Sequence, residues 1–183
     1  MENNTTFNNS SDYNTFCDEV LQQYSDTCAI KAQQLVLESN GIYINEIELR
    51  NEAIQNGWYV PGQGTPQEDV GNLAFNHGLE VHKYQEASIC DITNELAQGH
   101  QIIVGVDSGE LWTSGPDETF EDLITGKQAD HALIVSGFAT NPFTSEQTVL
   151  LTDPGTGDLC IHYPISQFED AWDDSNNFMV SIL

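Results

Sequence analysis

The chain has 183 residues and a formal net charge of −25, because 29 acidic side chains face only 4 Lys and Arg. This length fits one domain with a sizeable core, and a hydrophobic fraction of 39% indicates a globular protein rather than a disordered one. So acidic a surface repels nucleic acid and anionic lipid and attracts basic peptides or proteins, although solubility alone would also explain it. We therefore expect no nucleic-acid partner.

The N-terminal sequence predicts neither export nor membrane insertion. "MENNTTFNNSSDYN" has no basic region followed by an apolar one, so it is not a secretion signal of the usual kind. No window of 18 apolar residues exists, so we expect no membrane span and a cytoplasmic location, with export that uses no cleaved signal as the alternative. We interpret residues 1–15 as a disordered polar tail and residues 16–183 as a single domain.

The cysteines indicate neither a metal site nor a redox pair. They stand far apart, with no CxxC motif, at Cys17, Cys28, Cys90 and Cys160. The histidines likewise show no spacing typical of a zinc site. We therefore expect reduced thiols, no metal and no other cofactor.

The first half of the domain has the periodicity of helices. Residues 28–39 form the first predicted helix, with Asp26 or Thr27 as N-cap. Residues 45–56 form the second, with Asn45 as its cap.

A third helix is predicted after the glycine-rich turn 61–65. Thr65 would cap it, and Pro66 would take its first helical position. "HGLEV" at 77–81 would end this helix and begin a short strand, and residues 91–98 would form a fourth helix.

Beyond residue 100 the pattern changes to that of strands. Apolar runs typical of buried strands occupy residues 101–107, 131–138, 148–153 and 177–183, with a short helix at 166–172. The acidic stretch 108–128 would be an inserted surface loop or hairpin. Helices followed by strands predict an α+β fold, with an N-terminal helical layer packed on a mostly antiparallel C-terminal sheet.

Cys28 stands at the start of the first predicted helix, in "SDTCAIKAQQL". The unpaired N–H groups at a helix N-terminus stabilise a thiolate, which is the nucleophilic form of cysteine. Free cysteine is also among the most buried residue types, so this placement alone leaves a core residue as the alternative.

A thiol nucleophile needs a base and a group that orients the base. His131 opens the strand 131–138, and Asp153 ends the strand 148–153. If these strands pair as an antiparallel hairpin, the start of one lies beside the end of the other, which would place Asp153 next to His131. A structural histidine and an ordinary Asp-Pro-Gly turn are the alternatives for these two residues.

In their serial order these segments resemble the papain-like C39 and C39-like cysteine peptidases. This family comprises domains that trim double-glycine leader peptides and many stand-alone bacterial proteins. The resemblance covers roughly residues 18–183. It rests on "QQYSDTC", a Gly-Thr turn before a helix that ends in "HGLEV", the strands "QIIVGVD" and "DHALIVSGF", the turn "LLTDPGTGDL" and the segment "YPISQFEDAW".

The resemblance implies the papain-like fold and a soluble cysteine peptidase that acts on a peptide or protein. Cys28 would be the nucleophile, His131 the general base and acid, and Asp153 the residue that orients His131. Gln22, or Gln23 if the register differs by one, would stabilise the oxyanion together with the backbone N–H of Cys28.

One departure from the family pattern follows the cysteine, where members usually continue into Gly-Pro or Gly-Ala but this chain has Ala29 and Ile30. Two alternatives therefore stay open: a catalytically silent binding or adaptor protein, and an acyl-transfer relative such as a deamidase or transglutaminase. A metal-dependent hydrolase is a distant third. It would need a cluster of His and Asp at close spacing, and the sequence shows none. The charge adds the expectation of a basic substrate segment, and the oligomeric state stays open.

Overall fold

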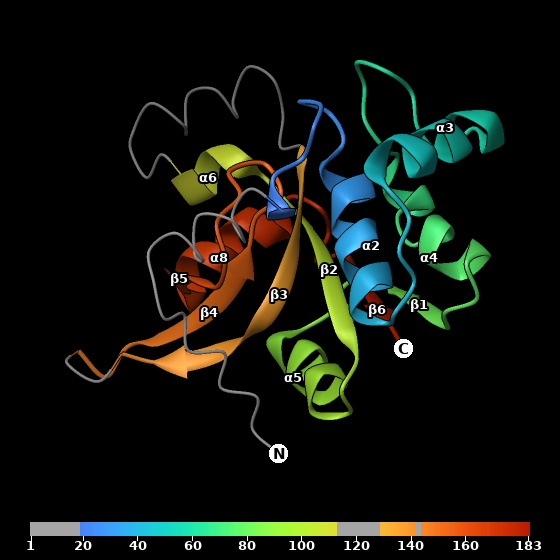
Figure 1. Ribbon diagram of the computed structural model, residues 1–183. Coiled ribbons are helices and arrows are strands. Elements are labelled where there is room, and N and C mark those ends of the chain that lie inside the picture. The colour runs from blue at the N-terminus through green and yellow to red at the C-terminus, as the bar shows by residue number, and fades with distance from the viewer. Residues whose placement is uncertain (1–18, 113–128, 142–143) are drawn as a thin grey trace.

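A six-stranded antiparallel sheet forms the centre of the molecule (Figure 1). The computed structural model describes residues 19–112, 129–141 and 144–183. The strands are Val81–Tyr84 (β1), Gln101–Val106 (β2), His131–Thr140 (β3), Gln147–Thr152 (β4), Ile161–Pro164 (β5) and Met179–Ile182 (β6). Their spatial order is β1-β6-β2-β3-β4-β5, and every neighbouring pair runs antiparallel.

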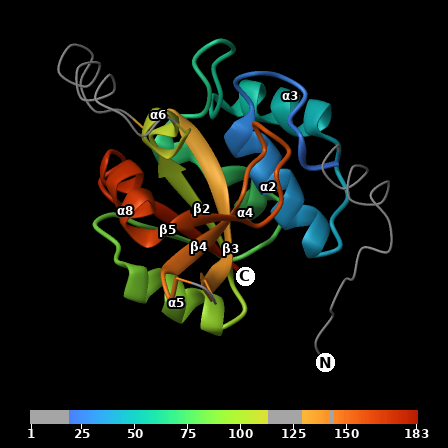
Figure 2. The same ribbon diagram turned by 90° about the vertical axis from the view of Figure 1, so that its left-hand side faces the viewer.

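Three N-terminal helices cover one face of this sheet, as Figure 2 shows from a second side. They are α2 (Cys28–Ser39), α3 (Glu46–Asn56) and α4 (Asn72–Asn76). α2 lies directly on the sheet, where Val36 packs with Ile103 and Val180 in one buried cluster. On its other side Leu37 packs with Leu49 of α3. Because α2 is covered on both sides, its position is fixed by the core.

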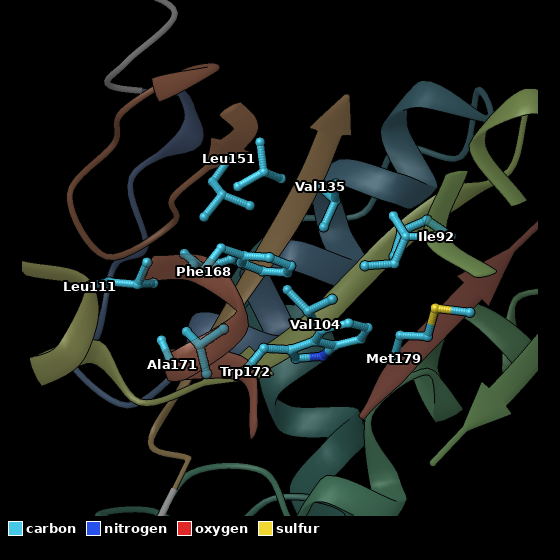
Figure 3. Packing of buried hydrophobic residues seen from close by; sticks show 13 residues of the cluster. Ile92, Val104, Leu111, Val135, Leu151, Phe168, Ala171, Trp172 and Met179 are labelled. Atoms are coloured by element: carbon cyan, nitrogen blue, oxygen red, sulfur yellow. The ribbon is translucent and has the colours of Figure 1, made fainter. Parts of the chain in front are cut away.

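A second helical layer covers the opposite face of the sheet. It comprises α5 (Ile89–Ala97), α6 (Ser108–Trp112) and α8 (Ile165–Asp173). Figure 3 shows Phe168 and Trp172 of α8 in one buried cluster with Val104 and Val135 of the sheet. The stacked rings of Phe168 and Trp172 have centroids 5.3 Å apart. The predicted α+β fold with an N-terminal helical layer is confirmed, and helices cover the second face of the sheet as well.

The prediction of one continuous third helix from Pro66 is wrong. In its place stand a single 3₁₀ turn, η1 (Gln67–Asp69), and the short helix α4. Gly71 separates them with a φ of 95°, a conformation that side chains rarely adopt. A Cβ at Gly71 would lie 2.8 Å from Cγ1 of Val81 and 2.9 Å from Cγ1 of Val180. The glycine thus lets the chain turn tightly against β1 and β6, which a continuous helix would not allow.

Other boundaries also differ from the prediction. β1 begins at Val81, the last residue of the segment 77–81 in which a short strand was expected to begin. α5 begins at Ile89 because the side chain of Ser88 accepts a hydrogen bond from the backbone N–H of Asp91 and caps the helix there. β5 was not predicted as a strand.

The predicted acidic insertion, residues 108–128, begins as a helix rather than a loop. Its first five residues form α6, whose Leu111 is buried. α6 is tied to α8 because Nε2 of Gln167 donates to the carbonyl oxygen of Leu111 at 2.9 Å. The rest of this stretch and the predicted tail 1–15 lie outside the described residues. Within the described residues, none of the helices combines the length and the apolar character needed to cross a membrane.

Candidate active site

The start of β3 and the end of β4 bring His131 and Asp153 together. Ile134 pairs with Thr152 in this hairpin, so the residue that follows β4 lies beside the first residues of β3. Nε2 of His131 lies 2.7 Å from Oδ1 of Asp153. Both side chains are buried, with 9% and 7% of their surfaces exposed. The two residues therefore make the contact that antiparallel pairing predicts.

The turn after β4 holds the carboxylate of Asp153. Its Oδ1 also accepts hydrogen bonds from the backbone N–H groups of Gly155 at 2.7 Å and Thr156 at 3.4 Å. Pro154 cannot extend the strand, since it has no N–H to donate. Gly155 leaves room for the imidazole, because a Cβ at this position would lie 2.9 Å from Cε1 of His131. The Asp-Pro-Gly sequence thus forms the turn and also positions the His131–Asp153 pair.

Cys28 is the first residue of α2, and its thiol lies in the same pocket as His131. The backbone N–H of Cys28 belongs to the first helical turn, whose N–H groups have no partner within the helix. The pocket has a volume of about 290 Å³. Its walls come from the segment before α2, the loop at residues 62–65, and the sheet around Gly105 and Ala132. Cys28, His131 and Asp153 thus come from three separate elements and meet at one place.

Electrostatic interactions couple these three side chains. Burial lowers the pKa of His131, but its hydrogen bonds to Asp153 and Cys28 and the charges of both outweigh burial and raise that pKa to about 10. Burial raises the pKa of Asp153, yet the hydrogen bond and charge of His131 and the backbone N–H of Gly155 bring it below its ordinary value. At neutral pH the pair is therefore an imidazolium beside a carboxylate. Nε2 of His131 contacts Asp153, so Nδ1 is the ring nitrogen that can interact with the thiol of Cys28.

Gln22 does not line this pocket in the structure. Its Nε2 donates to the carbonyl oxygen of Tyr24 at 2.6 Å, and its Oε1 is buried without a hydrogen-bond partner among the described residues. Its backbone N–H donates to the carbonyl oxygen of Pro154 at 2.8 Å, so the segment itself lies against the turn that holds Asp153. The side chain of Gln23 is exposed. Neither amide is brought to the position of an oxyanion donor, and the side chain of Gln22 would have to rotate to reach it.

Trp112 covers the ring of His131, a contact that the sequence does not predict. The two rings meet edge to face, with centroids 5.4 Å apart and an angle of 61° between their planes. The indole of Trp112 also interacts with the side chain of Tyr163 on β5 and acts against the rise that burial causes in its pKa. Trp112 lies in the acidic stretch that was expected to be a surface loop or hairpin. Nothing in its sequence position indicates that it would contact His131.

The lining of the pocket is partly apolar and partly acidic. Val70 and Phe178 contribute apolar surface, and Asp26 and Asp130 contribute carboxylates. Oδ2 of Asp26 accepts a hydrogen bond from the backbone N–H of Gly62 at 2.6 Å, which fixes the loop on that side. In the part of the chain that the structure describes, no group of three or more His, Cys, Asp or Glu side chains is placed to hold a metal ion.

Solved structures share this arrangement of the chain, although the sequence matches no family model and no curated protein. One is a protein from Bacillus anthracis described as a C39-like peptidase, with a TM-score of 0.67 and 16% sequence identity over 89% of this chain and 92% of that one. Another is the peptidase domain of Streptococcus ComA, a bifunctional ABC transporter in a quorum-sensing pathway. Its TM-score is 0.59, at 16% identity over 89% of this chain and 93% of that domain.

A third similar structure is a double-glycine-motif protease from an AMS/PCAT transporter, solved in complex with the leader peptide. The TM-score is 0.53 and the identity 14%, over 89% of this chain and 86% of that one. These matches extend over most of each chain, so the similarity concerns a whole domain rather than one motif. Identity this low shows a common fold and leaves the activity open. The chain therefore has the α+β papain-like fold of the C39-like peptidases.

Proposed function

We propose that this protein is a cysteine peptidase that hydrolyses a peptide or protein through Cys28, His131 and Asp153. One observation carries the proposal: a helix N-terminus, a strand start and a strand end each contribute one of these side chains to a single site. The raised pKa of His131 keeps its imidazole protonated at neutral pH beside the thiol of Cys28. A thiolate paired with an imidazolium is the reactive form of such a nucleophile.

In the proposed mechanism the thiolate of Cys28 attacks the scissile carbonyl carbon, and the carbonyl oxygen becomes an oxyanion. The backbone N–H of Cys28 donates to that oxyanion. His131 gives its proton to the leaving amine as the C–N bond breaks, which leaves a thioester on Cys28. Water, deprotonated by His131, then hydrolyses the thioester and releases the acid. Asp153 orients the imidazole and stabilises its positive charge throughout.

The charge of the pocket supports a substrate with basic residues near the scissile bond. Among the described residues, the charged side chains that line the pocket besides His131 are Asp26 and Asp130. The net charge of −25 would also attract a basic segment from solution. The leader peptide bound to the AMS/PCAT protease supports a peptide as the occupant of a site in this fold.

Alkylation of the individual thiols by iodoacetamide, followed by mass spectrometry as a function of pH, tests this proposal. Cys90 and Cys160 are exposed free thiols and serve as internal controls. We expect Cys28 to react about 10-fold faster than either at pH 6, because Cys28 is the one of these three described thiols that lies beside an imidazolium. His131→Ala should remove this advantage. Equal rates for the three thiols, or a rate for Cys28 that ignores His131→Ala, would contradict the proposal.

Peptide binding without cleavage is a second candidate, favoured by the hydrogen bond that holds the Gln22 amide on Tyr24. A protein of this kind would bind basic peptides equally well with Cys28→Ala and would form no acyl-enzyme with an activated peptide ester. A peptidase should form that acyl-enzyme on Cys28 and release peptides with a cut backbone. A deamidase or transglutaminase would form it too, but its products would be changed at a glutamine side chain.

A further inference from the structure

A buried carboxylate holds the turn that precedes Cys28, and the mechanism above does not use it. Glu46, the first residue of α3, has an exposed fraction of 0%. An acid buried to this degree is costly unless its oxygens accept good hydrogen bonds. The partners of Glu46 therefore indicate its role.

The oxygens of Glu46 accept hydrogen bonds from both ends of this turn, residues 23–27. The backbone N–H of Gln23 lies 3.1 Å from Oε1 and 3.0 Å from Oε2. The hydroxyl of Thr27, the residue directly before Cys28, donates to Oε1 at 2.5 Å. Thr27 also has an exposed fraction of 0%, so water does not compete for this contact. Glu46 thus binds the first and the last residue of the turn.

A second side chain of α3 holds the middle of the same turn. The guanidinium of Arg50, one helical turn after Glu46, lies 4.5 Å from the ring centroid of Tyr24. Nε of Arg50 donates to the hydroxyl of Tyr59 at 3.3 Å. The side chain of Tyr59 also interacts with the carboxyl group of Asp26 and lowers its pKa. The turn before Cys28 is therefore fixed on α3 as a unit, with Glu46 as its fully buried contact.

We propose that Glu46 is a positioning residue that sets the oxyanion donors of this site. The inference rests on the proposed peptidase function. The two candidate donors, the backbone N–H of Cys28 and the side chain of Gln22, flank the turn 23–27. The Thr27–Cys28 peptide directs the first donor, and Glu46 holds Thr27. A carboxylate suits this position because both groups that reach it are donors, whereas an amide would turn an NH₂ group toward one of them.

The variant Glu46→Gln separates the positioning of the oxyanion donors from the reactivity of the thiol. Two reactions of Cys28 make this possible, because only one of them needs the oxyanion donors. Alkylation by iodoacetamide forms no oxyanion. Binding of the peptide aldehyde acetyl-Leu-Leu-argininal forms a thiohemiacetal whose oxygen occupies the oxyanion position. We expect the affinity for the aldehyde to fall about 10- to 100-fold in Glu46→Gln. The alkylation rate of Cys28 should change by less than about 3-fold, because among the described residues no hydrogen bond joins Glu46 to His131 or Asp153.

Two further variants complete the experiment. Glu48→Gln is the matched control, since Glu48 lies exposed on the same helix, and it should change neither reaction. Thr27→Val keeps the shape of Thr27 without its donor and should lower the aldehyde affinity as Glu46→Gln does. This variant also provides the comparison if Glu46→Gln does not fold.

The outcomes distinguish the inference from the function on which it rests. Equal losses in both reactions together with a lower melting temperature, or no loss in either, would mean that Glu46 is structural only, and the inference would be wrong. A wild-type protein whose Cys28 neither alkylates fast nor binds the aldehyde would overturn the proposed function and the inference with it. Fast alkylation combined with a selective loss of aldehyde affinity supports both.

Discussion

Nε2 of His131 lies 2.7 Å from Oδ1 of Asp153. His131 is the first residue of β3, and Asp153 directly follows β4, the neighbouring strand. This contact orients the imidazole so that its other nitrogen remains for Cys28. It depends on the register of the β3–β4 hairpin, on the turn after Asp153 and on the cover that Trp112 provides. Several of these supports can be changed one at a time.

Asp153→Asn should shift the pH range in which Cys28 is reactive. The pKa of His131 is raised from 6.5 to about 10, so the imidazolium persists at neutral pH and is lost as the pH rises through about 10. Without the carboxylate, burial acts against the charged ring, and the imidazolium should be lost at lower pH. The pH profile of Cys28 alkylation measures this shift. An unchanged basic limb would show that Asp153 does not set the pKa of His131.

The stability of the folded state should follow the same two groups. Because the folded-state pKa of His131 lies above its unfolded value, the stabilisation by the pair is fully present below about pH 6.5 and is lost as the pH rises through about 10. The pKa of Asp153 is lowered, so on the acid side the stabilisation is lost as the pH falls through that lowered value. Urea unfolding of the wild type and Asp153→Asn across this range should give curves that converge at both extremes.

Gln22→Ala should weaken binding of the peptide aldehyde by about 10- to 100-fold if the amide rotates from Tyr24 to the oxyanion when the site is filled. Gln23→Ala is the matched control. The side chain of Gln23 is exposed, and its contact with Glu46 uses the backbone N–H, which alanine keeps. Equal effects of the two variants would remove Gln22 from the list of oxyanion donors.

Gly155→Ala should slow the alkylation of Cys28 by about 10-fold at pH 6, since a misplaced catalytic group loses this much or more. A Cβ at Gly155 would lie 2.9 Å from Cε1 of His131 and 3.2 Å from Oδ1 of Asp153, so the imidazole has to move. Pro154→Ala changes the same turn without adding a group near the ring and should leave the rate within about 3-fold. A Gly155→Ala protein as reactive as the wild type would mean that the ring can shift without loss.

Gly71→Ala should lower the free energy of unfolding by about 3 kcal/mol or more, because strain in φ adds to a steric overlap. Gly78→Ala measures the strain in φ without the steric overlap. The φ of Gly78 is 92°, close to the 95° of Gly71, but its Cβ would meet nothing within 4 Å. This control should cost about 1–2 kcal/mol. Denaturation of both variants in urea checks the difference, and equal costs would show that β1 and β6 yield to the added methyl group.

The sequence predicts those parts of the fold that depend on near neighbours. The helix at 28–39 has the predicted bounds, and Asn45 caps α3 as expected, with its side chain accepting from the backbone N–H of Glu48. The third helix fails because the need for glycine at position 71 arises from Val81 and Val180, on strands that the local pattern does not bring near. Local periodicity carries no information about such contacts.

The candidate site likewise has contacts that the sequence predicts and contacts that it does not. The contact between His131 and Asp153 follows from the pairing of two recognisable strands. The contacts of Glu46 with the turn before Cys28, and of Trp112 with His131, join segments whose proximity only the packed core determines. The orientation of the Gln22 amide toward Tyr24 likewise has no signal in the residue types.

β6 has a consequence for the order in which the molecule is completed during synthesis. This strand, Met179–Ile182, lies between β1 and β2, and Phe178, just before it, lines the pocket. A nascent chain therefore contains Cys28, His131 and Asp153 well before β1 can join the sheet and before the pocket wall is whole. The pocket can therefore reach its final form only after residues 178–182 have been synthesised, so a chain cut short before Phe178 would carry the three side chains in an unfinished site.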